Sequence, residues 1–197
     1  MKKFSLLLLS LILICTSVNA QVLNSKFDSK NHPKAKGVWV TVRYPTEWEA
    51  KEGERPNIVK KFSGYYKGIF VMLALQIRDA GEPIEQECTG MSTSEFSLAL
   101  TEGETDIKLN NMKKTRHEEK PGFIYEMSYS TERAGKALSN YSKVMMICNK
   151  KAMIFMNCSG MKIDKQNQTF TSTRRELLEV EPMCFQFFNS LVVMDKY

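Results

Sequence analysis

The sequence predicts a single α+β domain whose β-sheet is covered on both faces. Apolar residues alternate along residues 38–44, as in a strand with one buried face. Residues 69–77 are apolar at odd and even positions alike, so this strand has no polar face for water and should be central in a covered sheet. Two segments, starting near Ser92 and near Pro182, repeat apolar residues at helical spacing and should pack on that sheet.

The first twenty residues have the composition of a secretory signal peptide. Lys2 and Lys3 precede an uncharged stretch rich in Leu and Ile, and Val18-Asn19-Ala20 suits cleavage between Ala20 and Gln21. The alternative is a membrane anchor, but the apolar stretch of about 15 residues is shorter than the roughly 20 that span a bilayer. We therefore expect a secreted or periplasmic mature chain with no stable membrane span.

The mature chain carries a mild basic excess and a mixed-charge surface. The full chain has a net charge of +6, and Lys2 and Lys3 contribute two of these charges. Acidic and basic residues lie close together within residues 47–55 and 116–120. A nucleic-acid-binding protein would instead gather basic residues on one face. The pattern predicts a solvated surface and no nucleic-acid partner.

The order of elements follows from periodicity and from turn residues. Residues 21–36 are polar and aperiodic, which predicts a flexible lead-in before a domain at residues 37–197. Residues 45–57 contain proline, glycine and many charges, which predicts a loop. Further strands are expected at 58–63, 107–113 and 123–129, and an antiparallel hairpin at 144–148 and 152–158.

Both helices have sequence signals at their ends. Ser92 and Glu95 have the spacing of a capping box, and Gly103 lies where a helix would stop. Pro182 suits the first turn of a second helix, whose Phe-rich face includes Phe187 and Phe188. This terminal helix should pack on the sheet.

Four of the five cysteines remain after removal of the signal peptide. They are the disulfide candidates Cys88, Cys148, Cys158 and Cys184, and they allow three full pairings in an oxidising compartment. Cys148 should lie at the hairpin turn and Cys158 about six residues along the strand, roughly 20 Å away at ~3.3 Å per residue. Because a disulfide needs a Cα separation below ~7 Å, these two should not be bonded to each other. The sequence contains no Cys-x-x-Cys motif, so it indicates neither a redox pair nor a zinc site.

The two ends of the domain resemble the PsbP-like α/β/α sandwich superfamily. Residues 37–48 (GVWVTVRYPTEW) read as a strand that ends in Tyr-Pro and is followed by Trp48, and residues 185–192 (FQFFNSLV) are similar to the family's terminal helix. The order of elements is compatible along most of residues 37–192. The resemblance implies a curved antiparallel sheet with helices on both faces, a Trp48 that fixes its loop onto the domain, and binding or assembly roles. It carries over no functional residue.

The sequence contains no recognisable catalytic residues and no metal ligands. The nucleophile, phosphate-loop and zinc-protease motifs are missing, and His32 and His117 are far apart and expected to be solvated. The acidic residues at 47, 49, 52 and 54 share a loop with Lys51 and Arg55, so they too are expected to be solvated. Met145, Met146, Met153 and Met156 could suggest copper ligands, but Met also fills apolar cores, which is the interpretation that we favour.

The leading functional hypothesis is therefore a non-catalytic exported protein without a cofactor, which binds a protein or another envelope component. The alternative is an envelope hydrolase that uses carboxylates and His117 from the loops at 45–57 and 103–122. That alternative requires the two loops to converge on one pocket.

Export and disulfide formation predict the mass of the mature protein. Protein purified from its native host should begin at Gln21, and reduction should raise its mass by the hydrogens of two disulfides. Intact-mass spectrometry with and without reductant measures both properties. A mass that retains residues 1–20 with free thiols would contradict both expectations.

Overall fold

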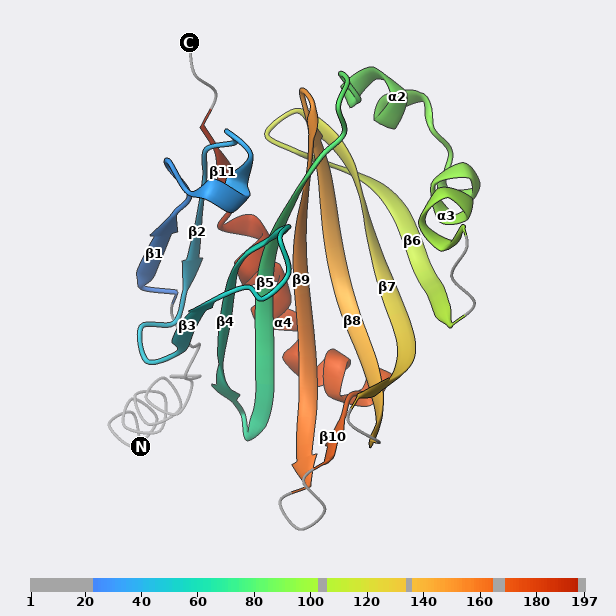
Figure 1. Ribbon diagram of the computed structural model, residues 1–197. Helices are drawn as coiled ribbons and strands as arrows, with labels where there is room; N and C mark the ends of the chain where they lie inside the picture. The colour runs from blue at the N-terminus through green and yellow to red at the C-terminus, as the bar shows by residue number, and fades with distance from the viewer. Residues whose placement is uncertain (1–22, 103–105, 134–135, 165–168, 195–197) are drawn as a thin grey trace, which may run out of the picture.

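The computed structural model describes residues 23–102, 106–133, 136–164 and 169–194, and its main feature is an eight-stranded sheet (Figure 1). The predicted signal peptide and its cleavage site at Ala20 and Gln21 lie outside these residues. The elements, in chain order, are β1 (Ser25–Asp28), η1 (Pro33–Ala35), β2 (Val40–Tyr44), β3 (Glu49–Glu52), β4 (Ile58–Tyr66), β5 (Ile69–Asp79), α2 (Glu85–Gly90), α3 (Thr93–Thr101), β6 (Ile107–His117), β7 (Lys120–Arg133), β8 (Lys136–Asn149), β9 (Ala152–Asp164), β10 (Thr169–Thr171), α4 (Arg174–Asn189) and β11 (Val192–Val193).

Most neighbouring strands of the large sheet are antiparallel. Its order is β3-β4-β5-β9-β10-β8-β7-β6, and β9 also pairs directly with β8. The short β10 pairs antiparallel with β9 and parallel with β8. A separate three-stranded sheet, β1-β2-β11, lies beside the large one (Figure 1).

The apolar segment at residues 69–77 is a central strand, as its composition predicts. β5 pairs with β4 on one side and with β9 on the other. Val71, Leu73, Leu75 and Ile77 are fully buried on one face, and Ala74 is buried on the opposite face. The other side chains of that second face, Phe70, Met72 and Gln76, are partly exposed, so the strand is central but only one of its faces is fully covered.

α4 covers one face of the large sheet and forms the main core there (Figure 1). It starts at Arg174, not near Pro182 as predicted, because Thr173 and Glu176 form a capping box and Pro182 lies inside the helix. An internal proline costs a helix about 3 kcal/mol. The buried α4 side chains contribute about 1.5–3 kcal/mol each, which outweighs that cost; they include Leu177, Val180, Met183, Phe187 and Phe188.

α2 and α3 pack beside β6, β7 and β8 and form a second, smaller core (Figure 1). The predicted capping box of α3 is present, since Ser92 and Glu95 each bond the other's backbone. Phe96 of α3 stacks on Phe123 of β7 with ring centroids 4.1 Å apart. The fold is thus α+β with antiparallel sheets and few helices, but a helical layer that covers the whole of both sheet faces is not confirmed.

Two segments that were predicted to be irregular contain strands. Within the expected lead-in, β1 pairs with β2, Phe27 packs edge-on against Phe62, and Ala35 is buried. Within the expected loop at 45–57, β3 pairs with β4 although all its side chains are exposed. Neither strand has an apolar repeat, because β1 is very short and β3 is an edge strand that faces water.

Two disulfides join helices to the sheet. Cys88 of α2 is bonded to Cys148 of β8, and Cys158 of β9 is bonded to Cys184 of α4. Cys148 and Cys158 therefore belong to different disulfides. The bonded residues are 60 and 26 positions apart in the chain, so by the chain-entropy relation the disulfides contribute about 4.3 and about 3.5 kcal/mol.

The packing of Trp48 on Gly64 predicts a sensitive position in β4. Trp48 is buried and fixes its loop onto the domain, and a Cβ added at Gly64 would lie 2.4 Å from Trp48 Cδ1. Gly64→Ala should therefore lower the free energy of unfolding by about 1–3 kcal/mol. Gly90→Ala is the matched control, because an added Cβ meets nothing within 4 Å there. Urea unfolding followed by far-UV circular dichroism compares the two variants, and equal stabilities would contradict this packing argument.

Candidate functional site

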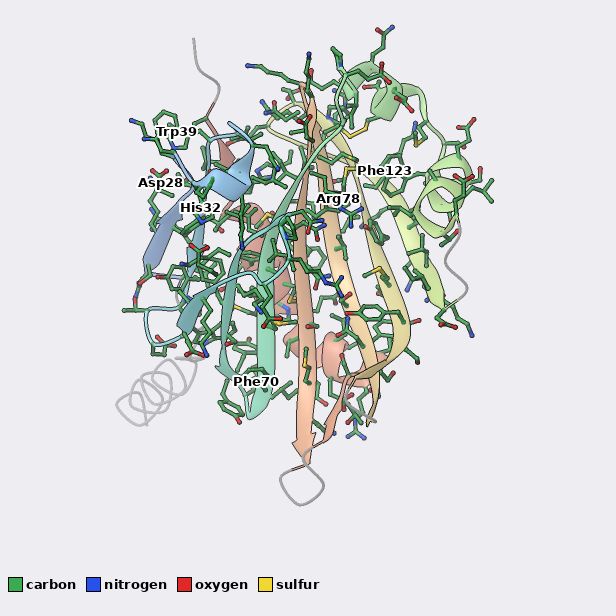
Figure 2. The ribbon with its side chains drawn as sticks, in the orientation of Figure 1. Asp28, His32, Trp39, Phe70, Arg78 and Phe123 are labelled. Atoms are coloured by element: carbon green, nitrogen blue, oxygen red, sulfur yellow. A yellow bond between two sulfur atoms is a disulfide. The ribbon has the colours of Figure 1, made fainter. Side chains whose placement is uncertain are left out.

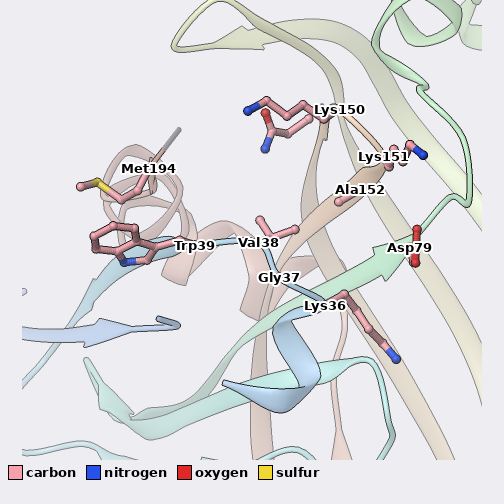
Figure 3. Close-up of a pocket in the computed structure, with 10 residues that line it drawn as sticks. Lys36, Gly37, Val38, Trp39, Asp79, Lys150, Lys151, Ala152 and Met194 are labelled. Carbon is pink, nitrogen blue, oxygen red and sulfur yellow. The ribbon is translucent and has the colours of Figure 1, made fainter. Parts of the chain in front are cut away.

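A cavity of about 230 Å³ lies where the β8–β9 turn meets the start of β2 (Figure 3). We call it the turn cavity. Its lining comes from the segment after η1, the end of β5, the β8–β9 turn and the segment after β11. The lining residues are Lys36, Gly37, Val38, Trp39, Asp79, Asn149, Lys150, Lys151, Ala152 and Met194.

The β8–β9 turn forms one wall of the cavity and is held by the chain before α2. The backbone N–H of Ala80 donates to the Lys151 carbonyl at 2.8 Å, and that of Ile84 donates to the Lys150 carbonyl at 2.9 Å. The disulfide of Cys148 fixes the residue before Asn149. The turn is therefore anchored on both sides of the hairpin.

The segment from Lys36 to Trp39 forms the opposite wall. Lys36 and Gly37 adopt left-handed backbone conformations, with φ of 52° and 79°, which turn the chain from η1 into β2. Trp39 Nε1 donates to Asp28 Oδ1 at 2.8 Å, and both residues are labelled in Figure 2. The backbone N–H of Met194 donates to the Trp39 carbonyl at 2.9 Å, which places Met194 beside the indole (Figure 3).

Several polar groups of the turn cavity lack a partner. Asn149 is only 7% exposed, yet its Oδ1 is buried and accepts no hydrogen bond within the described chain. Lys36 and Lys151 are exposed to solvent, and their ammonium groups make no ion pair or hydrogen bond with any described residue. Asp79 accepts from the Gly81 N–H through Oδ1, at 2.9 Å. The cavity is therefore bordered by exposed charged side chains and by one buried acceptor that has no donor.

The second polar cluster, under α4, differs because its groups are paired. Glu126 is 4% exposed and accepts hydrogen bonds from Asn111 at 2.8 Å, Tyr141 at 2.8 Å and Arg174 at 3.2 Å. Lys143 lies 3.8 Å from the other Glu126 oxygen. Burial raises the pKa of Glu126, but these hydrogen bonds outweigh burial and hold the pKa below its usual value. This cluster joins α4 to the sheet through paired groups.

The residues required for a hydrolase do not converge. Glu49 and Glu52 lie on β3, at one edge of the large sheet, and His117 ends β6, at the other edge. His117 is not simply solvated, because its Nε2 lies 2.7 Å from the Leu191 carbonyl. His32 is likewise partnered, since its Nε2 lies 3.0 Å from Glu52. Both expectations of solvated histidines are therefore wrong, and both side chains join neighbouring segments.

The four hairpin methionines pack with the apolar cores. Met145 and Met156 lie in the main core, Met146 lies in the second core, and Met153 packs against the second core. Within the described ranges, no group of three or more His, Cys, Asp or Glu side chains is placed to hold a metal ion. Over the same ranges, none of the helices combines the length and apolarity needed to cross a membrane.

The architecture matches a solved structure of known fold. The solution structure of cyanobacterial PsbP (CyanoP) from Synechocystis aligns with 91% of this chain and 97% of its own, with a TM-score of 0.51 and 13% sequence identity. The chain has a PsbP-like fold. This agrees with the sequence resemblance at the two ends of the domain. A crystal structure from Bacteroides thetaiotaomicron aligns with 89% of this chain and 50% of its own, at a TM-score of 0.45 and 11% identity. No family model and no curated protein matches the sequence.

Sequence reasoning located parts of the turn cavity in this PsbP-like fold without recognising a site. It placed Asn149, Lys150 and Lys151 in a hairpin turn and Trp39 in the first strand. Because these segments are more than 100 residues apart in the chain, no motif connects them. The one local signal was the pair of lysines in a turn, which is common on protein surfaces.

The cap of α4 predicts how stability depends on pH. Glu176 is buried; burial raises its pKa, but hydrogen bonds from Thr173 and Lys162 outweigh burial and lower the pKa to about 2. A carboxyl group whose pKa is lower in the folded state stabilises the fold above its unfolded pKa, and this contribution is lost as pH falls through the folded pKa. Stability should therefore decrease between about pH 5 and pH 2, with a contribution of about 3 kcal/mol from Glu176.

Glu176→Gln should remove that part of the pH dependence. The control is Glu179→Gln, because Glu179 is exposed and pairs only with Arg175 one helical turn away. Urea midpoints at pH 7, 4 and 3 measure the slope for each variant. An unchanged slope in Glu176→Gln would show that the cap carboxylate does not have the lowered pKa.

Proposed function

We propose that the mature protein is an exported, non-catalytic binding or accessory protein of the cell envelope, and that the turn cavity is its recognition site. The observation that carries the proposal is the turn cavity itself, a hollow of about 230 Å³ lined by the exposed lysines Lys36 and Lys151. A concave site with apolar walls and a few polar side chains is the usual location for ligand binding.

Three further features support this proposal. The signal-like segment at residues 1–20 and the two disulfides agree with an oxidising compartment outside the cytoplasm. The sequence resemblance to the PsbP-like superfamily implies binding or assembly roles. The acidic residues of β3 and the histidine of β6 lie at opposite sheet edges, so the described residues do not assemble the hydrolytic site of the alternative hypothesis.

Equilibrium dialysis against the small-molecule fraction of the native host's envelope tests this function. We expect the wild-type protein to enrich at least one small molecule, because the cavity combines a concave surface with exposed charged side chains. The double variant Lys36→Ala, Lys151→Ala should lose that enrichment. Mass spectrometry of both compartments identifies the molecule and shows whether it is chemically changed.

Lys108→Ala is the control for charge removal, because Lys108 is exposed on β6 and distant from the cavity lining. It should retain the enrichment. A product that forms only with the protein present would contradict a non-catalytic role. Enrichment that survives in the double variant would show that the turn cavity is not the site.

A further inference from the structure

α4 carries a second apolar stripe, on the side that faces away from the sheet. Leu178, Pro182 and Phe185 follow each other at intervals of four and three residues, which places them on one side of a helix. Leu178 is 46% exposed, Phe185 is 37% exposed, and Pro182 is exposed as well. The elements that pack most closely on α4 are β2, β5, β8 and β9, and the buried side of the helix faces them (Figure 1). We call the exposed side the α4 stripe.

The α4 stripe is held in a fixed shape before any partner arrives. The Phe185 ring packs edge-on against Phe188, with centroids 6.3 Å apart, and Lys143 Nζ lies 4.9 Å from the Phe185 ring centroid. The disulfide of Cys184 to Cys158 fastens the helix to β9. A surface that is already ordered loses little conformational entropy on binding.

The order of side chains along the α4 stripe is self-complementary. Exposed polar residues stand at its two ends, apolar residues stand inside them, and proline lies between; the order is Arg174, Leu178, Pro182, Phe185 and Asn189. A second copy rotated by half a turn about an axis near Pro182 places each Leu178 against the other copy's Phe185. The same rotation places the polar ends against each other. An antiparallel pair of α4 helices therefore matches apolar with apolar and polar with polar.

The charges of α4 favour the antiparallel direction. Arg174 and Arg175 lie in its first turn, at the positive end of the helix dipole, whereas its last turn has no basic residue. In an antiparallel pair these arginines lie beside the negative, C-terminal end of the other helix. A parallel pair would instead bring four arginines together.

Pro182 adds a polar group to the same surface. Because proline has no N–H, the backbone carbonyl of Leu178 loses its usual donor one turn earlier, under the exposed ring. Gln186 is partly exposed one turn after Pro182. In the antiparallel arrangement, Gln186 of the second copy lies level with Leu178, and its side-chain amide is a donor for that carbonyl.

We propose that the protein forms a twofold-symmetric dimer in which the α4 stripes of two copies pack antiparallel. A single helix pair lies at the small end of interface sizes, so the dimer is weak and depends on concentration. A lipid surface is a poorer occupant, because membrane-surface helices use a wide apolar face and the wide apolar face of α4 is buried in the main core. No residue that lines the turn cavity belongs to α4, so this inference is independent of the proposed function and the dimer presents two turn cavities.

Sedimentation velocity of the mature protein, at concentrations up to about 1 mM, tests the dimer. The sedimentation coefficient of the wild type should rise with concentration. Leu178→Glu should weaken the association at least tenfold, because it places a carboxylate against Phe185 of the second copy. Leu98→Glu is the matched control, since Leu98 is 71% exposed on α3, and it should associate like the wild type.

A mixture of two variants provides a test that misfolding cannot imitate. Leu178→Glu and Phe185→Lys should each fail to associate alone, because each places a charge against an apolar side chain. Mixed together they should associate, because one contact pairs the new carboxylate with the new ammonium group and the other keeps the original Leu178 and Phe185. A mixture of Leu178→Glu with Leu178→Lys is the control, since only a parallel pair would bring these positions together.

Three results would overturn the inference. The first is a wild type that stays monomeric over the whole concentration range. The second is a Leu178→Glu variant that associates as strongly as the wild type, which would move the contact to another surface. The third is restored association in the control mixture and not in the mixture of Leu178→Glu with Phe185→Lys, which would exclude the antiparallel arrangement. Dialysis of the envelope fraction tests the turn cavity separately, so each proposal can fail without the other.

Discussion

β5 and β9 pair along residues 70–79 and 152–161, in the middle of the large sheet, and each strand buries side chains on both faces. Strands of this kind are stable only when other elements cover both faces. α4 supplies the cover on one side, with buried apolar side chains from Leu177 to Phe188. α2 and α3 supply a smaller cover near β7 and β8, where Phe96 stacks on Phe123. The disulfides link a helix of each cover to β8 or β9, which holds the covers in place.

The turn cavity lies at the end of the sheet where this packing stops. β5 ends at Asp79, and the β8–β9 hairpin turns at Lys150 and Lys151, so the strands no longer fill the space beside β2. The neighbouring walls are held by backbone hydrogen bonds and by the Cys88–Cys148 disulfide. A rigid rim around unpaired polar groups favours binding, because little conformational entropy is lost when a ligand enters.

The polar cluster under α4 and the turn cavity show two different uses of buried polar side chains. Glu126 is satisfied by three donors, and its cost of burial is offset within the protein. Asn149 Oδ1 is buried with no donor, and its cost is not offset by any described residue. Both clusters are polar in composition, and only the arrangement of partners distinguishes a structural network from a candidate site.

The sequence by itself determined the elements whose signals are local. The apolar run of β5 indicates a central strand, the Ser92–Glu95 spacing caps α3, and the short polar turn places β8 beside β9. Tertiary structure alone decided the rest. β1 and β3 exist because they pair with β2 and β4, and α4 continues through Pro182 because its buried face outweighs one lost hydrogen bond. The turn cavity also belongs here: Lys36 and Asn149 are distant in sequence, and only the folded sheet places them around one space. Local patterns record which face of a segment is buried, whereas a site depends on which segments meet.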